Sequence, residues 1–465
     1  MSDPLDVESL ATEVADDNFS DDRLTARLAT IIRRLGKQPS ASFPSAFSSA
    51  ELEGAYRFFS NVFVTPAAIL APHVVATKHR ASNLASVRLV HDTTEISFRH
   101  DGKRRGFRED GPQHFLAHVS LALSCEASGK PLGVAAVETW VDGDYDNQQD
   151  VWLQQIRASE VALDAKGRAI HITDREGDDY LLFHELLLAG HRFVVRSSID
   201  RWTTSVVDGS KGKLRTVMAT VEHVAERSAK INPRARNSSA HRRKIYPARD
   251  ARSVTLHIAG ARLELVRPSS YVPSGKKAHL CHLPVALAVN VVRVWEPEPP
   301  AGADPIEWLL FTSEPINTPE EVSAVVDHYR ARWTIEEYFK ALKTGCAFEQ
   351  RQLQDYESLT NALAIFAPLA YHVLLLRTVA RADPEAHASE VATPDELDVL
   401  RVLGRRELPP NPTVRDVLLA VAALGGHIKY APDPGWLTIA RGYEKLETLV
   451  EGWKAAKLHP HSDQR

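Results

Sequence analysis

Residues 168–197, RAIHITDREGDDYLLFHELLLAGHRFVVRS, hold two short apolar runs on either side of a stretch with helical periodicity. The runs 168–174 and 192–197 are rich in Ile, Val and Phe and predict β-strands, whereas residues 178–189 between them predict a helix. A strand, a helix and a second strand in this order indicate a domain of the α/β class.

The preceding segments extend this pattern. Runs 87–98, 118–125 and 133–141 predict three further strands, and residues 147–164 predict a helix. Three strands followed by helix, strand, helix and strand is the element order of a ribonuclease H-like core. A doubly wound nucleotide-binding fold is the alternative, and it is disfavoured because no glycine-rich phosphate loop follows any of these runs.

Three acidic residues accompany these elements. Asp92 and Asp174 end apolar runs, and Glu336 lies in the strongly helical stretch 329–340. Two strand-end aspartates and one helix glutamate form the ligand set of a two-metal phosphoryl-transfer site, because carboxylate oxygens suit Mg²⁺ or Mn²⁺. We predict that these three residues are catalytic and bind two Mg²⁺ ions, with Mn²⁺ as a substitute. The first and fourth strands, which carry the aspartates, are neighbours in sheets of this kind.

The helix around Glu336 carries further polar side chains at helical spacing. At about 100° per residue, four side chains project within roughly 60° of each other, namely Tyr329, Arg332, Glu336 and Lys343. On this face Arg332 can bind phosphate as a bidentate fork and Lys343 as a point charge. Glu337 projects about 100° away and is predicted to face outward. The alternative is a solvated helix with an ion pair between Arg332 and Glu336.

The spacing Tyr329-x2-Arg332-x3-Glu336-x6-Lys343 resembles the signature of bacterial cut-and-paste DDE transposases, in particular the insertion-sequence-four family and its Tn-five type. The resemblance covers nearly the whole chain. The other segments that carry it are residues 22–28, 53–58, 92–94, 174–176, 192–197, 308–312, 425–426 and 451–453. Each segment is short, and the match becomes specific through their order along one chain.

The resemblance implies a ribonuclease H-like fold, excision through hairpin ends and a dimer at synapsis. It also implies that Trp308 stacks on a base turned out of the DNA end. Arg196 is implied to contact DNA, although Ser198 stands where the family has a second cation.

The N-terminal segments resemble the family's end-recognition domain. The positions that match it are Arg27, Lys37 and Arg57. Arginine and lysine on an exposed helix face can read guanine edges or fix the phosphate register. One alternative is a solvated helical cap, and another is that Arg57 is buried against Glu53 as a helix pair.

The length of 465 residues exceeds what one hydrophobic core organises, so we predict three parts. Residues 1–70 are predicted to form a helical DNA-end-binding domain, and residues 71–375 the ribonuclease H-like catalytic core. Within the core, β-rich runs predict an insertion at about 200–305. Residues 376–465 are predicted to form a helical C-terminal dimerisation domain.

The net charge of −4 does not by itself indicate DNA binding, so local clusters matter more. The densest cluster is the basic segment 230–252, with eight Lys or Arg residues and Asp250 as its one acid. We predict that it contacts phosphate; the alternative is a solvated loop.

The scattered cysteines, Cys125, Cys281 and Cys346, predict reduced thiols in a bacterial cytoplasm. The apolar run 362–376 is short for a membrane span and predicts a buried helix.

Some features resemble metal sites less well. His279-x-Cys281-His282 has the form of half a zinc site, but no partner pair stands at a suitable spacing, so zinc is not predicted. The acids after Asp174 are predicted to be charges at a helix N-terminus rather than metal ligands. These acids are Glu176, Asp178 and Asp179.

The function predicted from the sequence is that of a DNA transposase. It would bind the terminal inverted repeats of its insertion element, cleave the ends and join them to target DNA. Double-stranded DNA and a second copy of the chain are the expected partners, with no membrane. One alternative is a catalytically silent DNA-binding inhibitor or repressor of transposition, and it is disfavoured because all three acids are present. Another is a structure-selective nuclease, which would lack the N-terminal end-binding helices.

Overall fold

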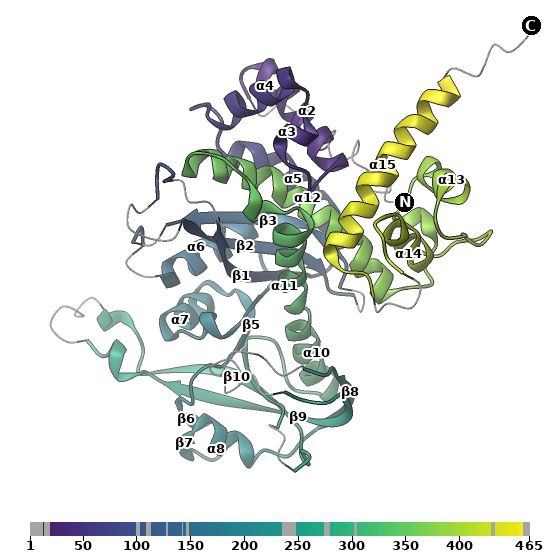
Figure 1. Cartoon of the computed structure of the whole chain (residues 1–465). Helices are drawn as coiled ribbons and strands as arrows, with labels where there is room; N and C mark the ends of the chain where they lie inside the picture. Colours follow the sequence, from purple (N-terminus) through teal and green to yellow (C-terminus); the bar gives the residue numbers. More distant parts are fainter. Residues whose placement is uncertain are drawn as a thin grey trace, which may run out of the picture. The chain divides into compact units, whose positions relative to one another are not determined.

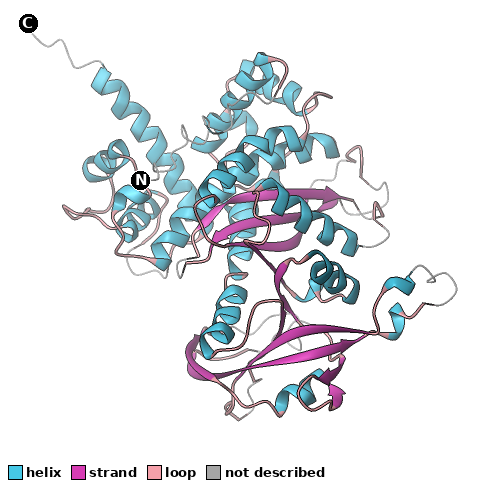
Figure 2. Cartoon of the chain, turned by 180° about the vertical axis from the view of Figure 1, so that it is seen from behind, coloured by secondary structure: helices cyan, strands magenta, loops and turns pink. Residues whose placement is uncertain are grey.

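The structure, a computed structural model, describes residues 13, 19–98, 103–107, 113–126, 129–141, 143–145, 148–234, 248–273, 280–301, 305–428 and 433–458. The chain divides into two compact units. Unit 1 comprises Met1–Ala165 and Trp333–Arg465, and unit 2 comprises Lys166–Arg332. Figures 1 and 2 show their helices and strands from two sides.

The N-terminal part of unit 1 is helical, as the sequence predicts. Its helices are α2 Asp22–Lys37, α3 Phe43–Ala46, α4 Ser49–Phe59 and α5 Pro66–Ala81. The Asp21 side chain accepts the Arg23 N–H before α2, and Ser48 and Glu51 form a capping box before α4. Helix α5 continues past residue 70, where the sequence places a domain boundary.

The sheet within unit 1 is antiparallel, with β2 between β1 and β3. The strands are β1 Val87–Ser97, β2 His114–Ser124 and β3 Pro131–Trp140. Helix α6, Gln148–Ala162, packs against β2 and β3. Strand β2 is buried along most of its length because it has a strand on each side and helices over it. The predicted strands and helix of this region are confirmed.

Helix α12, Tyr356–Ala382, is the central helix of unit 1. By length and composition it could cross a membrane, but 94% of its most apolar window is buried inside the protein. It packs against α5, β3 and α14. The prediction of a buried helix at 362–376 is therefore confirmed within a longer helix, which Asp355 caps by accepting the Ser358 N–H.

The C-terminal part of unit 1 is also helical. Its helices are α13 Pro394–Leu403, α14 Val414–Leu424 and α15 Trp436–Leu458. The backbones of helices α14 and α15 lie against each other at two glycines. A β-carbon at Gly425 would lie 1.9 Å from the Thr438 carbonyl oxygen, and one at Gly442 would lie 2.0 Å from that of Val421. Glycine is required at both positions, because any side chain would push the two helices apart.

Unit 2 contains a mixed sheet in the order β4, β5, β11, β10, β9, β6 and β7, with β8 also paired to β9. Its strands are β4 Ala169–Thr173, β5 Arg192–Arg196, β6 Trp202–Ser205, β7 Lys211–Lys213, β8 Ala225–Ile231, β9 Arg252–Val266, β10 Ala286–Trp295 and β11 Glu307–Thr312. Strands β4 and β5 are parallel and joined by α7, Tyr180–Ala189, whereas the other pairs are antiparallel. The predicted strand, helix and strand of residues 168–197 are confirmed.

The β-rich region has fewer and longer strands than its apolar runs suggest. Strand β9 joins the runs 254–258 and 262–266, and β10 joins the runs 285–289 and 291–294. Among the described residues of the unit are also the helices α8 Leu214–Ala219 and α10 Pro319–Arg330. Helix α10 packs across β4, β5, β9 and β10. That this region is an insertion into the catalytic core stays a prediction.

Candidate active site

Asp92 lies in the middle of β1, opposite Val119 of β2. The prediction that it stands at a strand end is therefore wrong. Residues 87–91 before it are buried, and partial exposure begins at Asp92. The strand continues to Ser97 because its more polar half still pairs with β2. Asp92 Oδ1 accepts the Thr93 N–H at 2.9 Å, so the sheet presents a partly exposed carboxylate.

A buried histidine supports the strand of Asp92. His118 is the register partner of Thr93, and its Nδ1 lies 2.9 Å from Thr93 Oγ1. The His118 ring also contacts Trp152 edge-on, with 4.5 Å between the ring centroids. Burial lowers the pKa of His118 to about 3, because a charged imidazolium would lose its solvation there. His118 is therefore neutral near pH 7 and adds no positive charge to this strand.

The helical stretch that carries Glu336 is interrupted. Helix α10 ends at Arg330, and α11, Trp333–Lys340, follows. In the turn between them the Arg332 N–H donates to the Tyr329 carbonyl oxygen at 3.0 Å, over three residues instead of four. Glu336 lies partly exposed in the first turn of α11, which packs against β1.

Lys343 lies beyond α11 in the π-helical turn Ala341–Gly345. The Cys346 N–H donates to the Ala341 carbonyl oxygen at 2.7 Å, and this i→i+5 bond places one residue more in the turn than an α-helix does. The helix is thus broken on one side of Glu336 and widened on the other. The single regular helix that the prediction assumes is therefore interrupted, and the shared face of Tyr329, Arg332, Glu336 and Lys343 stays a prediction.

Unit 1 nevertheless brings Lys343 to the strand of Asp92. The Lys343 ammonium donates to the Glu95 carbonyl oxygen, three residues along β1 from Asp92. It also lies 3.7 Å from Glu349 Oε1. The π-helical turn that carries Lys343 therefore places its ammonium group against β1.

Glu337 is buried, which corrects the prediction that it faces outward. Its carboxylate lies 2.7 Å from Lys340 Nζ, 3.5 Å from Arg377 and 3.4 Å from Arg381. Both arginines belong to α12, so Glu337 fastens α11 to the central helix. The angular spacing of residues along the helix does not reveal that Glu337 is buried, because α11 packs against protein on two sides, β1 and α12.

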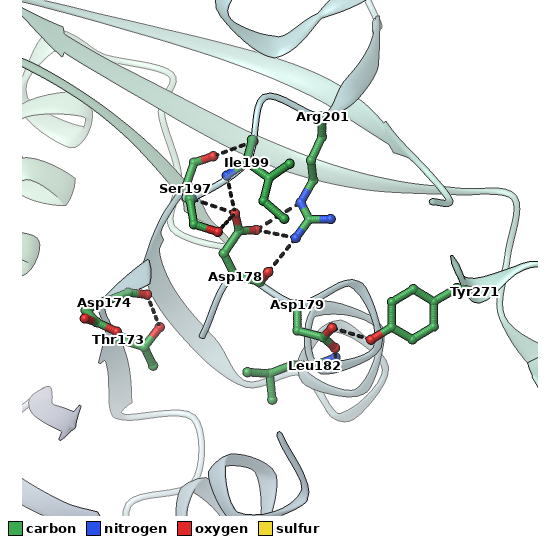
Figure 3. Close-up of polar contacts among 10 residues, drawn as sticks. Thr173, Asp174, Asp178, Asp179, Leu182, Ser197, Ile199, Arg201 and Tyr271 are labelled. Atoms are coloured by element: carbon green, nitrogen blue, oxygen red, sulfur yellow. Dashed lines mark hydrogen bonds and ion pairs between the residues drawn. The ribbon is translucent and has the colours of Figure 1, made fainter. Parts of the chain in front are cut away.

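Asp174 directly follows β4, at a strand end as predicted, and caps the 3₁₀ turn Arg175–Gly177 (Figure 3). Its Oδ1 accepts the Glu176 N–H at 2.8 Å. The pKa of Glu176 is raised by partial desolvation of its carboxylate, although the residue lies at the surface, and by the negative charge of Asp174. The two carboxylates are therefore close enough to influence each other.

Asp178 is a buried anchor, and the prediction that it is a helix charge is wrong. Its Oδ2 accepts the N–H groups of Ser198 at 2.6 Å and Ile199 at 3.1 Å, and its Oδ1 lies 2.8 Å from an Nη atom of Arg201 (Figure 3). The Ser198 hydroxyl also donates to Asp178, so Ser198 binds an acid. No local pattern could reveal the partners, because the nearest is twenty residues away. Asp179, by contrast, is the N-cap of α7, as predicted.

Three residues chosen from the sequence converge within unit 2. Trp308 on β11 and Tyr329 at the end of α10 meet edge-on with ring centroids 5.4 Å apart. The Arg196 guanidinium lies 5.9 Å from the Trp308 centroid and 6.0 Å from that of Tyr329. Register explains this, because Arg196 pairs opposite Leu310, two residues from Trp308 on the same face of β11. The Tyr329 ring is buried, whereas Trp308 is partly exposed.

The cations of the N-terminal helices have different surroundings. The Arg27 guanidinium lies against Gly54 of α4, where an added β-carbon would be 2.3 Å from an Nη atom. Lys37 forms an ion pair with Glu451 of α15. Arg57 pairs with Glu53 one turn earlier, as the alternative expected, but both side chains are exposed rather than buried.

Two sequence features lie partly outside the described residues. The residues that lie outside are 235–247 of the basic segment 230–252 and His279 of the cysteine–histidine motif. At the ends of the basic segment, Arg234 and Arg249 pair in an antiparallel bridge. Near the motif, ligand atoms of His282, His184 and Glu185 come within 4.8 Å of one another, a proximity that sequence spacing does not show.

Comparison with known proteins gives matches in two regions. Residues 8–64 match the family described as Transposase DNA-binding, and residues 140–369 match the family described as Transposase DDE domain. Asp174 and Glu336 lie inside the second region, whereas Asp92 precedes it. Among solved structures the chain is similar to piggyBac transposase, in the cryo-EM structure of its synaptic complex with hairpin DNA. That match has 8% sequence identity and a TM-score of 0.30, and it covers 82% of this chain and 55% of that chain.

Proposed function

We propose that this chain, which carries a transposase DNA-binding domain followed by a DDE transposase domain, cleaves the DNA ends of its own insertion element and joins them to target DNA. The observation that carries the proposal is the presence of both domains in one chain, with Asp174 and Glu336 inside the second. A domain that binds DNA and a domain that cuts it together give an enzyme directed to particular ends. The enzyme would act in the bacterial cytoplasm.

A DDE domain implies the use of divalent metal ions, and the donor chemistry of this chain fits Mg²⁺. Asp92, Asp174 and Glu336 supply hard carboxylate oxygens, and each side chain is partly exposed. When bound, two such ions stabilise the attacking and leaving oxygens at phosphorus. The three carboxylates would hold the ions, with Mn²⁺ able to replace Mg²⁺.

The protein's own side chains would orient the DNA. Arg196 would hold a phosphate with its planar guanidinium, and Lys343 would add a point charge beside β1. Arg332, in the turn before α11, is a third candidate for phosphate contact. Contacts of this kind to phosphate would fix the scissile bond without reading its sequence.

The partly exposed Trp308 supports a mechanism with hairpin ends. A hairpin needs a tight turn of one strand, and turning a base out of the stack relieves that turn. An aromatic face offsets part of the unstacking cost, by about 1–3 kcal/mol per base. Tyr329 packs edge-on against Trp308 and would keep its ring in place.

Recognition of the terminal inverted repeats is assigned to the N-terminal helices. Arg27, Lys37 and Arg57 lie in the region matched by the DNA-binding family. Synapsis of two ends needs two copies of the chain, and the C-terminal helices within residues 376–465 are the proposed dimerisation surface.

The test uses purified protein, linear DNA with the flanking repeats, and Mg²⁺. The variants Asp92→Asn, Asp174→Asn and Glu336→Gln should abolish strand cleavage and keep end binding, because each removes one charge and little volume. Glu320→Gln, at an exposed acid in the first turn of α10, is the control and should cleave normally. Wild-type protein that binds the ends but never cuts them would support the inhibitor function instead. Cleavage by Glu336→Gln would refute the assignment of the site.

A further inference from the structure

Two histidines and a glutamate gather on the edge of the sheet in unit 2. Glu226 of β8 and His257 of β9 are directly opposite register partners, and His223 stands three residues before Glu226. The Nε2 atoms of His223 and His257 each lie 3.3 Å from Glu226 Oε1. The two imidazole rings are stacked, with centroids 4.0 Å apart.

These separations fit a metal site. Zinc binds imidazole nitrogen and carboxylate oxygen at about 2.0–2.2 Å, so neighbouring ligands of a tetrahedral ion are roughly 3.3–3.5 Å apart. The distances from Glu226 to both histidines have this value. The fourth position would be taken by water, as it is at zinc sites with three protein ligands.

The surrounding sheet holds the donors in place. Trp295 of β10 is the register partner of His257 on its other side, and their ring centroids are 5.5 Å apart. The nearby cation Arg293 lies over the Trp295 ring and pairs with Glu307 at 3.0 Å, so its charge is compensated. Side-chain exposure is 21% for His257 and 42% for His223. His257 is thus the fixed ligand, and the His223 ring has room to tilt towards an ion.

We propose that His223, Glu226 and His257 form a binding site for one divalent transition-metal ion, with Zn²⁺ as the ion that the donor set favours. Imidazole nitrogen suits zinc, copper and nickel, whereas Mg²⁺ prefers an all-oxygen shell. The site therefore differs in ion preference from the three carboxylates proposed for DNA cleavage. A bound ion would link the segment before β8 to β9 and stabilise this edge of the sheet.

The experiment measures Zn²⁺ binding to the metal-free full-length protein, with any histidine tag removed and excess Mg²⁺ present to occupy carboxylate sites. Wild type should bind one Zn²⁺ that the double variant His223→Gln/His257→Gln does not bind. Glu226→Gln should weaken that binding at least about tenfold. His79→Gln, at an exposed histidine of α5, is the matched control and should bind as wild type does.

Two further readouts do not depend on activity. Cu²⁺ at the site should quench the fluorescence of Trp295, and this part of the quenching should vanish in Trp295→Phe and in the double variant. Zn²⁺ should raise the melting temperature of wild type but not of the double variant, because it binds the folded state. Equal Zn²⁺ stoichiometry in wild type and the double variant would overturn the proposal and leave only histidine–glutamate ion pairs. The same conclusion would follow if His79→Gln alone removed the binding.

Discussion

The guanidinium of Arg201 pairs with the carboxylate of Asp178 at 2.8 Å, and both side chains are almost completely buried. Asp178 follows β4 by a few residues, and Arg201 follows β5. The pair therefore ties the segment that carries Asp174 to the segment that carries Arg196. The backbone N–H groups of residues 198 and 199 also donate to Asp178. The buried Asp178 side chain therefore fixes the conformation of the loop after β5.

Replacing Arg201 with Met should destabilise unit 2 by about 3–5 kcal/mol, because it leaves the Asp178 carboxylate buried without its cation. Thermal unfolding and limited proteolysis of the loop after β5 would measure this loss. The matched control is Arg215→Met, since Arg215 is 58% exposed and its partner Glu307 keeps Arg293. That change should cost less than about 1 kcal/mol. Equal stability of the two variants would show that the buried pair is not an anchor.

Replacing Trp308 with Ala should reduce hairpin formation at the DNA ends while leaving end binding nearly unchanged. The loss follows from removing the aromatic face, which contributes about 1–3 kcal/mol per stacked base. Fluorescence of 2-aminopurine placed near the cleavage site would report base extrusion, and gel analysis would report hairpins. Trp308→Phe keeps a ring and should retain most of the activity. An Ala variant that extrudes the base as wild type does would rule out the stacking role.

The stability of unit 1 should fall as the pH drops from 6.5 towards 3, in part because of His118. Its pKa in the folded protein is about 3, below the usual 6.5, so the unfolded chain takes up a proton that the folded chain excludes. This contribution is complete above pH 6.5 and declines by up to about 1.4 kcal/mol per pH unit below it. His118→Gln, which can still bond Thr93, should show a shallower decline in urea unfolding between pH 7 and 4. His79→Gln should keep the wild-type slope, and an unchanged slope in His118→Gln would contradict the prediction.

The sequence predicts the fold well wherever the deciding pattern is local. The strands at 87–98 and 168–174 and the helix at 178–189 follow from apolar periodicity, which a short window contains. Prediction from the sequence fails where contacts with another part of the fold decide the geometry. The end of the apolar run at Asp92 suggests a strand end there, although the predicted strand 87–98 already extends beyond it, and pairing with β2 carries β1 on to Ser97.

In the candidate site, too, some features follow from local sequence and others depend on tertiary contacts. The family resemblance selected Arg196 and Trp308, and helical spacing selected Tyr329. Strand register places Arg196 near Trp308, and the Tyr329 ring at the end of α10 packs against both. The regular helix assumed around Glu336 is not present, because a tight turn precedes α11 and a π-helical turn follows it, and both change the angle per residue.

Replacing Arg27 with Ala should weaken binding to cognate ends by about 1–3 kcal/mol if the guanidinium reads a base. Band-shift titrations at fixed salt on cognate and random DNA separate the two kinds of contact, because a phosphate contact is lost equally on both. Gly54→Ala offers a second route, since the added β-carbon would displace the Arg27 guanidinium from its present place. Unchanged affinity in Arg27→Ala would exclude a role for this residue in end recognition.

Lys343 should contribute one phosphate contact, and Lys343→Met should therefore weaken binding on any DNA sequence. Its ammonium reaches β1 near Asp92 while lying 3.7 Å from the Glu349 carboxylate, so the acid competes with phosphate for the same cation. Losing one contact should make the slope of log affinity against log salt shallower by about 1. Glu349→Gln removes the competing charge and should strengthen binding with the slope kept or steepened. Titrations at several salt concentrations with both single variants and the double variant provide the measurement. If Lys343→Met leaves the slope unchanged and Glu349→Gln does not tighten binding, Lys343 serves only to hold the π-helical turn against β1.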